Sequence, residues 1–304
     1  MAGDRGVVGL IGLGQMGGPM ARTLRHAGWR VVAWDLAAAA VEAAGRDGIE
    51  PAADPAAVAA VAPIVLTSLP GAAAVRSVAL GERGLAAAGR GDLLVVDTST
   101  VAPGAAREVA ADLALRGIAF LDAPMSGGVA AAGSGQLSVM VGGDVRDLER
   151  ARPVLAAISK TIVHCGPIGA GQIAKACNQL IVMSTIAAVA EVMVLARASG
   201  LDPAVVREAL MSGLAASPIL DVHGDRMLRR DFAPGGRARY NLKDIDTIRG
   251  LGAIRGLDLP VFEAAAEQIG RLIEGWGGEL DNSAVVLVVE AAAGLAAEGH
   301  EEDD

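Results

Sequence analysis

The feature that most constrains this sequence is a glycine-rich turn between an expected strand and an expected helix. An apolar run over 7–11 leads into Gly12-Leu13-Gly14-Gln15-Met16-Gly17, and the residues that follow have helical character. Gly12 and Gly14 allow a tight turn whose N–H groups can approach a pyrophosphate, and Gly17 allows close packing of helix on sheet. A turn that merely joins strand to helix is the alternative. The position of the glycines directly after a strand favours a dinucleotide-binding site.

An acidic residue ends the second apolar run. Asp35 lies 18 residues after Gly17, where a carboxylate accepts hydrogen bonds from the adenosine ribose hydroxyls and repels a 2′-phosphate. No arginine occurs between Leu36 and Val41 to neutralise such a phosphate. We therefore expect NAD to be preferred over NADP, the alternative for Asp35 being an ordinary solvated turn residue.

Short apolar runs alternate with helical patterns through the first half of the chain, which is typical of a doubly wound parallel sheet. The expected strands cover 7–11, 31–34, 64–67, 93–97, 118–121, 137–141 and 161–165. A Gly-Pro-Ile-Gly stretch at 166–169 interrupts the pattern, and the long apolar segments beyond it have helical spacing. We expect an α/β domain of the Rossmann type over 1–167 and an all-helical domain over 168–304.

Two segments of the second half are unusually apolar. One covers 172–198 and the other 283–297. The first lacks basic flanks and contains Glu191, so we expect a buried core helix and no membrane span. Together the two segments need more burial than one small domain supplies, which predicts a homodimer or homotetramer.

Charge and composition argue against a nucleic-acid-binding, a secreted or a metal-binding protein. The net charge is −9 and aromatic residues make up 2% of the chain, so a nucleic-acid surface is not expected. The first five residues leave no room for a secretory signal, which favours the cytoplasm, and we expect the acidic end at 298–304 to be solvated. Cys165 and Cys177 have no metal-ligand spacing, so we expect buried, reduced cysteines and no metal.

Five ordered motifs resemble those of the β-hydroxyacid dehydrogenase family, which includes 3-hydroxyisobutyrate dehydrogenase and tartronate semialdehyde reductase. They are GLGQMGGPMA at 12–21, Leu69-Pro70, DTST at 97–100, DAPMSGG at 122–128 and GAGQIAKACNQ at 169–179. The resemblance covers nearly the whole chain. It implies a hydride transfer between nicotinamide and a small β-hydroxy acid or its semialdehyde.

The resemblance also implies a role for individual residues. Leu69, Pro70 and Thr100 match positions on the nicotinamide side of the cofactor, and Ser126, Gly127 and Gly128 match the site of the substrate carboxylate. Lys175 matches the catalytic lysine. Three further positions match contacts with substrate, namely Asn178, Gln179 and Lys243, and Lys243 also matches a contact with the cofactor.

Gln179 and the sequence Asp281-Asn282-Ser283-Ala284 look more like the tartronate semialdehyde reductases than the 3-hydroxyisobutyrate dehydrogenases. Pro234-Gly235-Gly236 departs from the family's commoner Pro-Gly-Phe. The neighbouring Arg237 and Arg239 suggest either a second anionic group on the substrate or two exposed arginines.

These residue types suit the chemistry of alcohol oxidation. Removing the hydroxyl proton requires a base, and a lysine can serve where burial and a neighbouring cation disfavour its ammonium form. Helical spacing puts Gln172, Lys175 and Asn178 on one face, where one substrate could touch all three. A lysine that merely extends from an apolar helix is the alternative.

Two other functions fit parts of the pattern. An imine reductase resembles this family but usually has Asp or Tyr at the position of Lys175, and a non-catalytic dinucleotide sensor would need only the glycine turn. The set of Lys175, Asn178 and Ser126 favours the dehydrogenase over both.

Overall fold

The computed structural model describes residues 5–295, and the chain divides into two compact units, 1–175 and 176–304. The division falls within one long helix, α8, which covers Ala170–Ala198. The segment 298–304 lies outside the described residues. We call the two parts unit 1 and unit 2.

Unit 1 is built on a nine-stranded sheet of the order β3-β2-β1-β4-β5-β6-β8-β7, with β9 paired to β8. The strands are β1 Val7–Ile11, β2 Arg30–Trp34, β3 Glu50–Pro51, β4 Ile64–Thr67, β5 Leu94–Asp97, β6 Ala119–Asp122, β7 Met125–Ser126, β8 Leu137–Gly142 and β9 Ser159–Gly166. The pairs from β3 to β6 are parallel, β8 is antiparallel to β6 and β7, and β9 is parallel to β8. All seven expected strands are present, which confirms the Rossmann-type α/β prediction.

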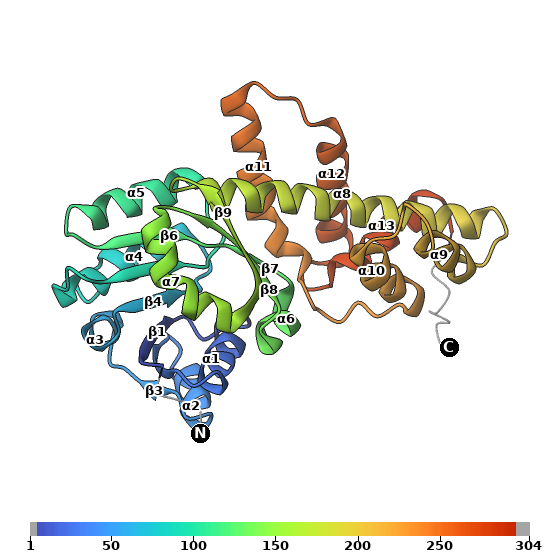
Figure 1. Ribbon diagram of the computed structural model, residues 1–304. Helices are drawn as coiled ribbons and strands as arrows, with labels where there is room; N and C mark the ends of the chain where they lie inside the picture. The colour runs from blue at the N-terminus through green and yellow to red at the C-terminus, as the bar shows by residue number, and fades with distance from the viewer. Residues whose placement is uncertain (1–4, 296–304) are drawn as a thin grey trace. The chain divides into compact units, whose positions relative to one another are not determined.

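Helices cover both faces of this sheet, as Figure 1 shows for unit 1. They are α1 Gly17–His26, α2 Ala38–Arg46, α3 Pro55–Val61, α4 Ala72–Leu80, η1 Leu85–Ala88, α5 Pro103–Ala114, α6 Gly128–Ser134 and α7 Val145–Ile158. Buried residues of α1, α2, α6 and α7 form one core with the sheet, and those of α3, α4 and α5 form a second core on the opposite face. Parallel strands buried on both faces explain the continuous apolar runs of the sequence.

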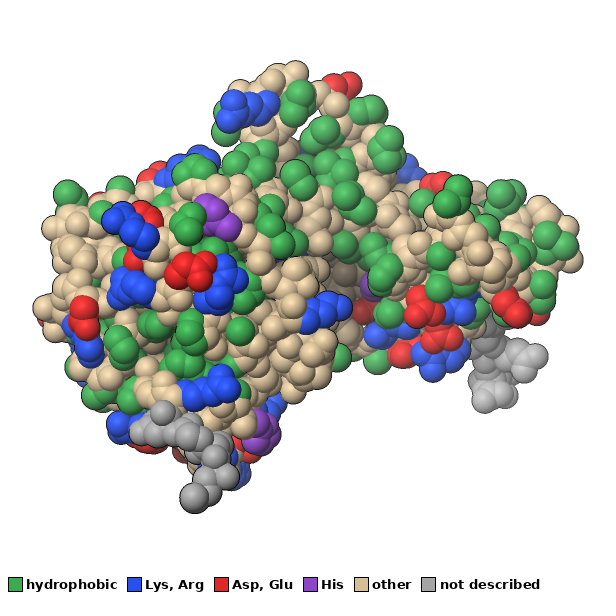
Figure 2. All heavy atoms as spheres, viewed as in Figure 1, with side chains coloured by type: hydrophobic (Ala, Val, Ile, Leu, Met, Phe, Trp, Pro, Cys, Tyr) green, Lys and Arg blue, Asp and Glu red, His purple; other side chains and the backbone are tan. Residues whose placement is uncertain are grey.

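Unit 2 is helical in the described residues, which confirms the all-helical prediction. Besides α8 it contains α9 Pro203–Met211, α10 Pro218–Arg229, η2 Ala238–Tyr240, α11 Asn241–Arg255, α12 Pro260–Trp276, η3 Asn282–Ala284 and α13 Val285–Ala292. Figure 2 shows charged side chains of both signs around α10 and hydrophobic side chains over other parts of this unit.

The two apolar segments differ in their surroundings. In α13, Val285 to Val288 are buried in the core of unit 2 itself, so this helix does not need a partner chain to cover it. In α8, Met183, Ile186 and Ala190 are buried, whereas Ile181 and Leu195 are 62% and 67% exposed. The sequence predicts that the two segments together need more burial than the domain supplies. Within the described residues, which end at 295, α8 keeps exposed apolar side chains and α13 is covered by unit 2 itself.

The helix α8 is long and apolar enough to cross a membrane by length and composition, with a mean hydropathy of 2.0 over its most apolar stretch. Core helices pass the same test. The buried residues of α8 belong to apolar clusters shared with α10, α12 and α13, which is the arrangement expected of a core helix.

Candidate active site

The glycine turn leaves its backbone open to a ligand. Gly12 has φ +93°, and a Cβ there would lie 2.2 Å from the Ser68 carbonyl oxygen. A Cβ on Gly17 would lie 1.8 Å from the Gly12 carbonyl oxygen, whereas one on Gly14 would meet nothing within 4 Å. In the described chain no side chain caps the start of α1 at Met16. The turn therefore offers backbone and a helix amino terminus to an anionic group, as a pyrophosphate requires.

Asp35 lies beside this turn. Its Oδ2 accepts a hydrogen bond from the Leu13 amide over 2.6 Å, and its Oδ1 accepts one from the Ala37 amide over 2.7 Å. The carboxylate is half-buried at the end of β2, next to β1 in the sheet. It is thus a fixed negative group at the edge of the glycine turn and not a freely solvated turn residue.

The segments that carry Leu69 and Thr100 are joined at the carboxyl ends of β4 and β5. The Ser99 hydroxyl accepts a hydrogen bond from the Leu69 amide over 2.9 Å, and the Thr98 hydroxyl donates one to the Thr67 carbonyl over 2.7 Å. Because β4 and β5 pair in parallel, both segments leave the sheet at the same edge as the glycine turn. Ligands of open α/β sheets bind at this edge.

Two buried carboxyl groups, those of Asp97 and Asp122, lie at this edge. The sequence interpretation gave neither of them a role. Asp97 accepts hydrogen bonds from the Thr67 hydroxyl over 2.7 Å and the Ser99 amide over 3.1 Å. Burial raises the pKa of Asp97 to about 6 and also raises the pKa of Asp122. The sequence did contain a signal for these two residues, because each lies at the end of an expected buried strand or directly after it. An ionisable side chain at such a position is costly unless it is hydrogen-bonded, which indicates a specific role.

The turn at Ser126-Gly127-Gly128 follows the short strand β7. Gly127 has φ +129° and Gly128 has φ +69°, conformations that side chains rarely adopt. Both glycines are exposed and Ser126 is half-buried, so backbone and hydroxyl are accessible together. Consecutive glycines of this kind can present N–H groups to a carboxylate.

Lys175 is buried, with 9% of its surface exposed, in the second turn of α8. Gln172 lies three residues earlier, and its side chain bonds to backbone groups of unit 1. The Gln172 amide Nε2 donates to the Ser99 carbonyl over 2.8 Å, and Oε1 accepts from the Val101 amide over 3.1 Å. The expectation that Gln172 and Lys175 contact one substrate together is therefore wrong, because Gln172 is engaged inside unit 1.

In unit 2, the predicted substrate residues Asn178 and Gln179 belong to one hydrogen-bonded series. Asn178 Nδ2 donates to Gln179 Oε1 over 3.0 Å, and Gln179 Nε2 donates to Asp244 Oδ2 over 2.7 Å. Asp244 is buried in α11, next to the exposed Lys243. Gln179 thus links the helix of Asn178 to the helix of Lys243.

The two arginines at 237 and 239 share an acidic partner. Arg237 Nε lies 3.2 Å from Glu279 Oε2, and Arg239 pairs with the other oxygen of Glu279. Both guanidinium groups also lie over the ring of Tyr240, at 6.0 and 5.3 Å from its centroid. Glu279 offsets part of the positive charge that a second substrate anion would require.

The Pro234-Gly235-Gly236 segment is held by Asp281. The buried carboxylate accepts from the Gly235 amide over 3.0 Å and the Gly236 amide over 2.8 Å, and also from the Ser283 amide and hydroxyl. Burial alone would raise the pKa of Asp281, but His223 and these donors outweigh burial and hold that pKa well below its ordinary value.

The cysteines differ from expectation. Cys177 is exposed and Cys165 is half-buried, so the prediction that both are buried is wrong. The neighbours Lys175 and Ala176 take the buried positions of the helix, which turns Cys177 outward. Within residues 5–295, no three of His, Cys, Asp and Glu gather as a metal site would require.

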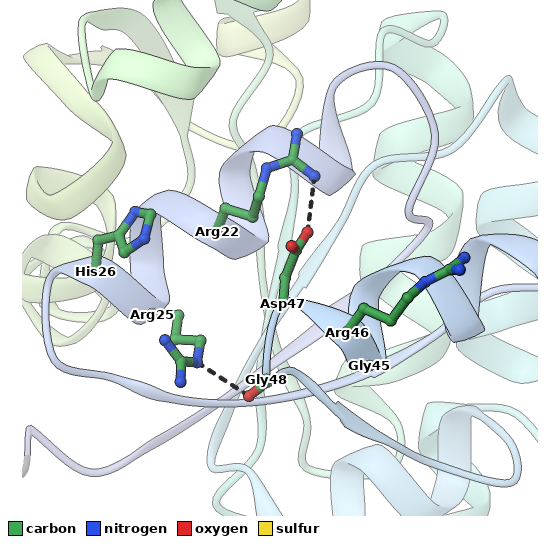
Figure 3. Close-up of a pocket in the computed structure, with 7 residues that line it drawn as sticks. All are labelled: Arg22, Arg25, His26, Gly45, Arg46, Asp47 and Gly48. Carbon is green, nitrogen blue, oxygen red and sulfur yellow. Dashed lines mark hydrogen bonds and ion pairs between the residues drawn. The ribbon is translucent and has the colours of Figure 1, made fainter.

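A pocket of about 390 Å³ lies at the other end of α1 (Figure 3). It is lined by Arg22, Arg25 and His26 of α1 and by Gly45 to Gly48 at the end of α2 and just after it. Arg22 pairs with Asp47 over 3.2 Å, and Arg25 donates to the Gly48 carbonyl over 3.1 Å. Basic side chains at helix carboxyl termini balance the helix dipole, so this pocket has a structural explanation apart from the glycine turn.

The fold and the glycine turn together define an NAD(P)-dependent dehydrogenase of the Rossmann class. Residues 7–166 match the NAD binding domain of 6-phosphogluconate dehydrogenase, and residues 169–289 match the NAD-binding domain of NADP-dependent 3-hydroxyisobutyrate dehydrogenase. The chain belongs to the β-hydroxyacid dehydrogenase family and acts on CH–OH groups.

Individual relatives match nearly the whole chain. The 2-hydroxy-3-oxopropionate reductase of Escherichia coli is 36% identical over 288 residues, which cover 94% of this chain and 98% of the relative. The solved 3-hydroxyisobutyrate dehydrogenase of Mycobacterium tuberculosis with L-serine has a TM-score of 0.84 and 33% identity, covering 93% of this chain and 99% of that one. An imine reductase from Pseudomonas sp. has a TM-score of 0.59 at 15% identity, with coverage of 93% and 99%, and shares the fold alone.

Proposed function

We propose that this protein transfers a hydride between NAD and a small β-hydroxy acid or its semialdehyde, with Lys175 as the proton-transfer residue. The observation that carries the proposal is the burial of Lys175 in the unit that also contains the glycine turn. Its helix begins at the same sheet edge, where Gln172 bonds to the segment around Thr100. A lysine that served only solubility would not be buried at this edge.

The residues present fit the dinucleotide. The turn at 12–17 offers approachable backbone, and the fixed carboxylate of Asp35 suits two ribose hydroxyls and opposes a 2′-phosphate. When bound, the nicotinamide ring accepts or donates the hydride. Leu69, Pro70 and Thr100 would hold that ring from the adjoining segments, with Lys243 as a further contact.

The protein supplies binding, orientation and the proton. Ser126, Gly127 and Gly128 would hold the substrate carboxylate, and Asn178, Gln179 and Lys243 would orient the hydroxyl-bearing end. Lys175 would accept the hydroxyl proton during oxidation and return it during reduction. These assignments rest on burial, on backbone geometry and on the family motifs.

The substrate class that we propose is 3-hydroxyisobutyrate or 2-hydroxy-3-oxopropionate. Gln179 and the 281–284 sequence favour the second. The test is a panel of β-hydroxy acids, their semialdehydes and a cyclic imine, assayed with NAD(H) and NADP(H) by absorbance of the reduced cofactor. We expect turnover of at least one hydroxy acid and none of the imine.

Two results would reject this function. Turnover of the imine alone would reverse the ranking in favour of an imine reductase. Tight binding of NADH, measured by fluorescence, without turnover of any panel member would favour a dinucleotide sensor.

We also propose that the protein is a homodimer or homotetramer. Cys177, Ile181 and Leu195 lie on one exposed stripe of α8, interrupted by Glu191, which accepts a hydrogen bond from Gln268. Such an apolar stripe is a typical self-association surface. Light scattering should give two or four times the 30.5 kDa chain mass, and Ile181→Asp with Leu195→Asp should lower it. The control Leu115→Asp, at an exposed leucine of unit 1, should leave the mass unchanged.

A further inference from the structure

The start of α8 is capped by a carboxylate from another part of unit 1. Asp122, at the end of β6, accepts hydrogen bonds from the Gly169 amide over 2.7 Å and from the Gln172 amide over 2.9 Å. The first amides of a helix have no acceptor within the helix, so a cap must come from elsewhere. Here the cap is 47 residues distant in sequence from Gly169.

Neighbouring glycines leave room for the Asp122 carboxylate. A Cβ on Gly142 would lie 2.4 Å from an Asp122 oxygen, and a Cβ on Gly171 would lie 2.9 Å from one. Asp122 is fully buried. A side chain at Gly142 would therefore displace the carboxylate from the helix start, and one at Gly171 would also meet the Met140 carbonyl oxygen at 2.4 Å.

Gln172 makes a second connection from the same turn of α8. Its carboxamide donates to the Ser99 carbonyl and accepts from the Val101 amide, on the two sides of Thr100. The side chain is 1% exposed, and these hydrogen bonds join positions more than 70 residues apart. Both polar ends of the amide are satisfied by one short stretch of backbone.

We infer that Gln172 and Asp122 form a clasp that positions Lys175 for the proposed reaction, an inference that rests on the proposed function. The clasp joins three segments. The first is 99–101, which contains Thr100; the second is 122–128, which contains the Ser-Gly-Gly turn; and the third is the start of α8. Lys175 follows Gln172 by about one helical turn. Fixing the position of Gln172 therefore fixes the backbone from which the Lys175 side chain extends. Both are positioning residues.

The expected effect is on turnover more than on binding. A displacement of about 1 Å at a reacting group can lower a rate roughly 100-fold. The hydrogen bonds of the Gln172 side chain go to Ser99 and Val101 and not to the glycine turn or to Asp35, so their loss should change affinity for the dinucleotide little. The KM for substrate should change less than kcat.

Two variants at Gln172 test the clasp. Gln172→Leu removes both hydrogen bonds at similar volume. Gln172→Glu keeps the acceptor for the Val101 amide, but when ionised it sets an oxygen against the Ser99 carbonyl, whereas its protonated form restores the donor. Gln136→Leu and Gln136→Glu, at an exposed glutamine of unit 1, are the matched controls.

The first measurement is hydrogen exchange at the Val101 amide without substrate or cofactor. We expect Gln172→Leu to raise its exchange rate at least about tenfold, which corresponds to a loss of about 1.4 kcal/mol of protection. The Gln136 variants should leave the rate unchanged. Unchanged protection in Gln172→Leu would overturn the clasp whether or not the protein is a dehydrogenase.

The second measurement is kcat as a function of pH. We expect Gln172→Leu to lower kcat about 10- to 100-fold, with NADH affinity within about 2-fold of the parent. For Gln172→Glu, the ratio of its kcat to that of the parent should fall as pH rises through the pKa of the introduced carboxyl. A constant ratio, or kcat near the parent value in Gln172→Leu with increased exchange, would overturn the positioning role.

The two proposals fail separately. If Gln172→Leu does not fold, the pH dependence of Gln172→Glu decides the positioning role. If the parent protein turns over no hydroxy acid, the proposed function fails, and the exchange rate of Val101 still decides whether Gln172 holds that segment.

Discussion

The Asp35 carboxylate accepts a hydrogen bond from the Leu13 amide over 2.6 Å, across 22 residues of sequence. The contact fixes the end of β2 against the glycine turn. It places a negative charge where the adenosine ribose of a bound dinucleotide would lie in this class of fold.

Removal of this charge should change the cofactor preference. We expect Asp35→Ser combined with Leu36→Arg to lower kcat/KM for NAD and to raise it for NADP, shifting the ratio by about 100-fold. The reason is that repulsion of the 2′-phosphate is replaced by a guanidinium that can pair with it. Steady-state kinetics with both cofactors measure the ratio, and a parent enzyme that strongly prefers NADP would contradict the role of Asp35.

The buried Asp97 should make unit 1 less stable at neutral pH than at acid pH. Burial raises the pKa of Asp97 from 3.8 to about 6 in the folded state. The stability that its protonated form provides is therefore present below about pH 4 and is lost as the pH rises through about 6, by up to roughly 3 kcal/mol. Asp97→Asn lacks this dependence.

Urea unfolding at a series of pH values can check this. The chain has three tryptophans, and in a Trp276→Phe background only Trp29 and Trp34 of unit 1 report by fluorescence. The free energy of unfolding of the parent should decline relative to Asp97→Asn between pH 4 and 7. Parallel curves would show that Asp97 is not the group responsible.

A buried glutamate paired with two partly exposed arginines should contribute much to the stability of unit 2. Glu290 is 5% exposed and accepts two hydrogen bonds from Arg230, over 2.7 and 2.8 Å, and one from Arg197 over 3.3 Å. Glu290→Ala would leave two arginines without this carboxylate and should cost about 3 kcal/mol. Glu263→Ala, which breaks the exposed pair with Arg249, should cost less than about 1 kcal/mol. Thermal unfolding compares the two, and equal losses would contradict the argument.

Asp281 should stabilise unit 2 in the opposite pH range from that of Asp97. Because the folded-state pKa of Asp281 is lowered, its contribution is complete above about pH 4 and is lost as the pH falls further. Asp281→Asn should therefore lower the melting temperature at pH 7, with a smaller difference at pH 3. A difference that grows on acidification would contradict the assignment.

Much of the fold could be predicted from sequence because buried parallel strands have distinctive apolar runs. The two missed strands, β3 and β7, have only two residues each, and β3 is exposed, so neither has an apolar pattern. Helical periodicity likewise identified α8, whose start at Ala170 lies two residues before the expected one. The short strands depend on tertiary pairing, which sequence does not display.

The candidate site was less accessible to prediction. The motifs predicted Lys175 and the glycine turns as site residues. Helical spacing predicted that Gln172 could touch the same substrate as Lys175, because such spacing fixes the face of a residue and not its partner. The partners of Gln172 are backbone groups more than 70 residues away. Cys177 was expected inside because free cysteines are usually buried, and an apolar helix does not show which of its stripes remains exposed.

The most direct test of the account is the turnover of Lys175→Ala at saturating substrate and NAD, with NADH affinity measured on the same preparation. The matched control is Lys160→Ala, at an exposed lysine of unit 1. We predict that Lys175→Ala lowers kcat by about 100-fold or more, since loss of a general base typically costs about 10²- to 10⁴-fold. NADH affinity and the Lys160 control should stay within about 2-fold of the parent. A Lys175→Ala protein that keeps the parent turnover would contradict the central claim.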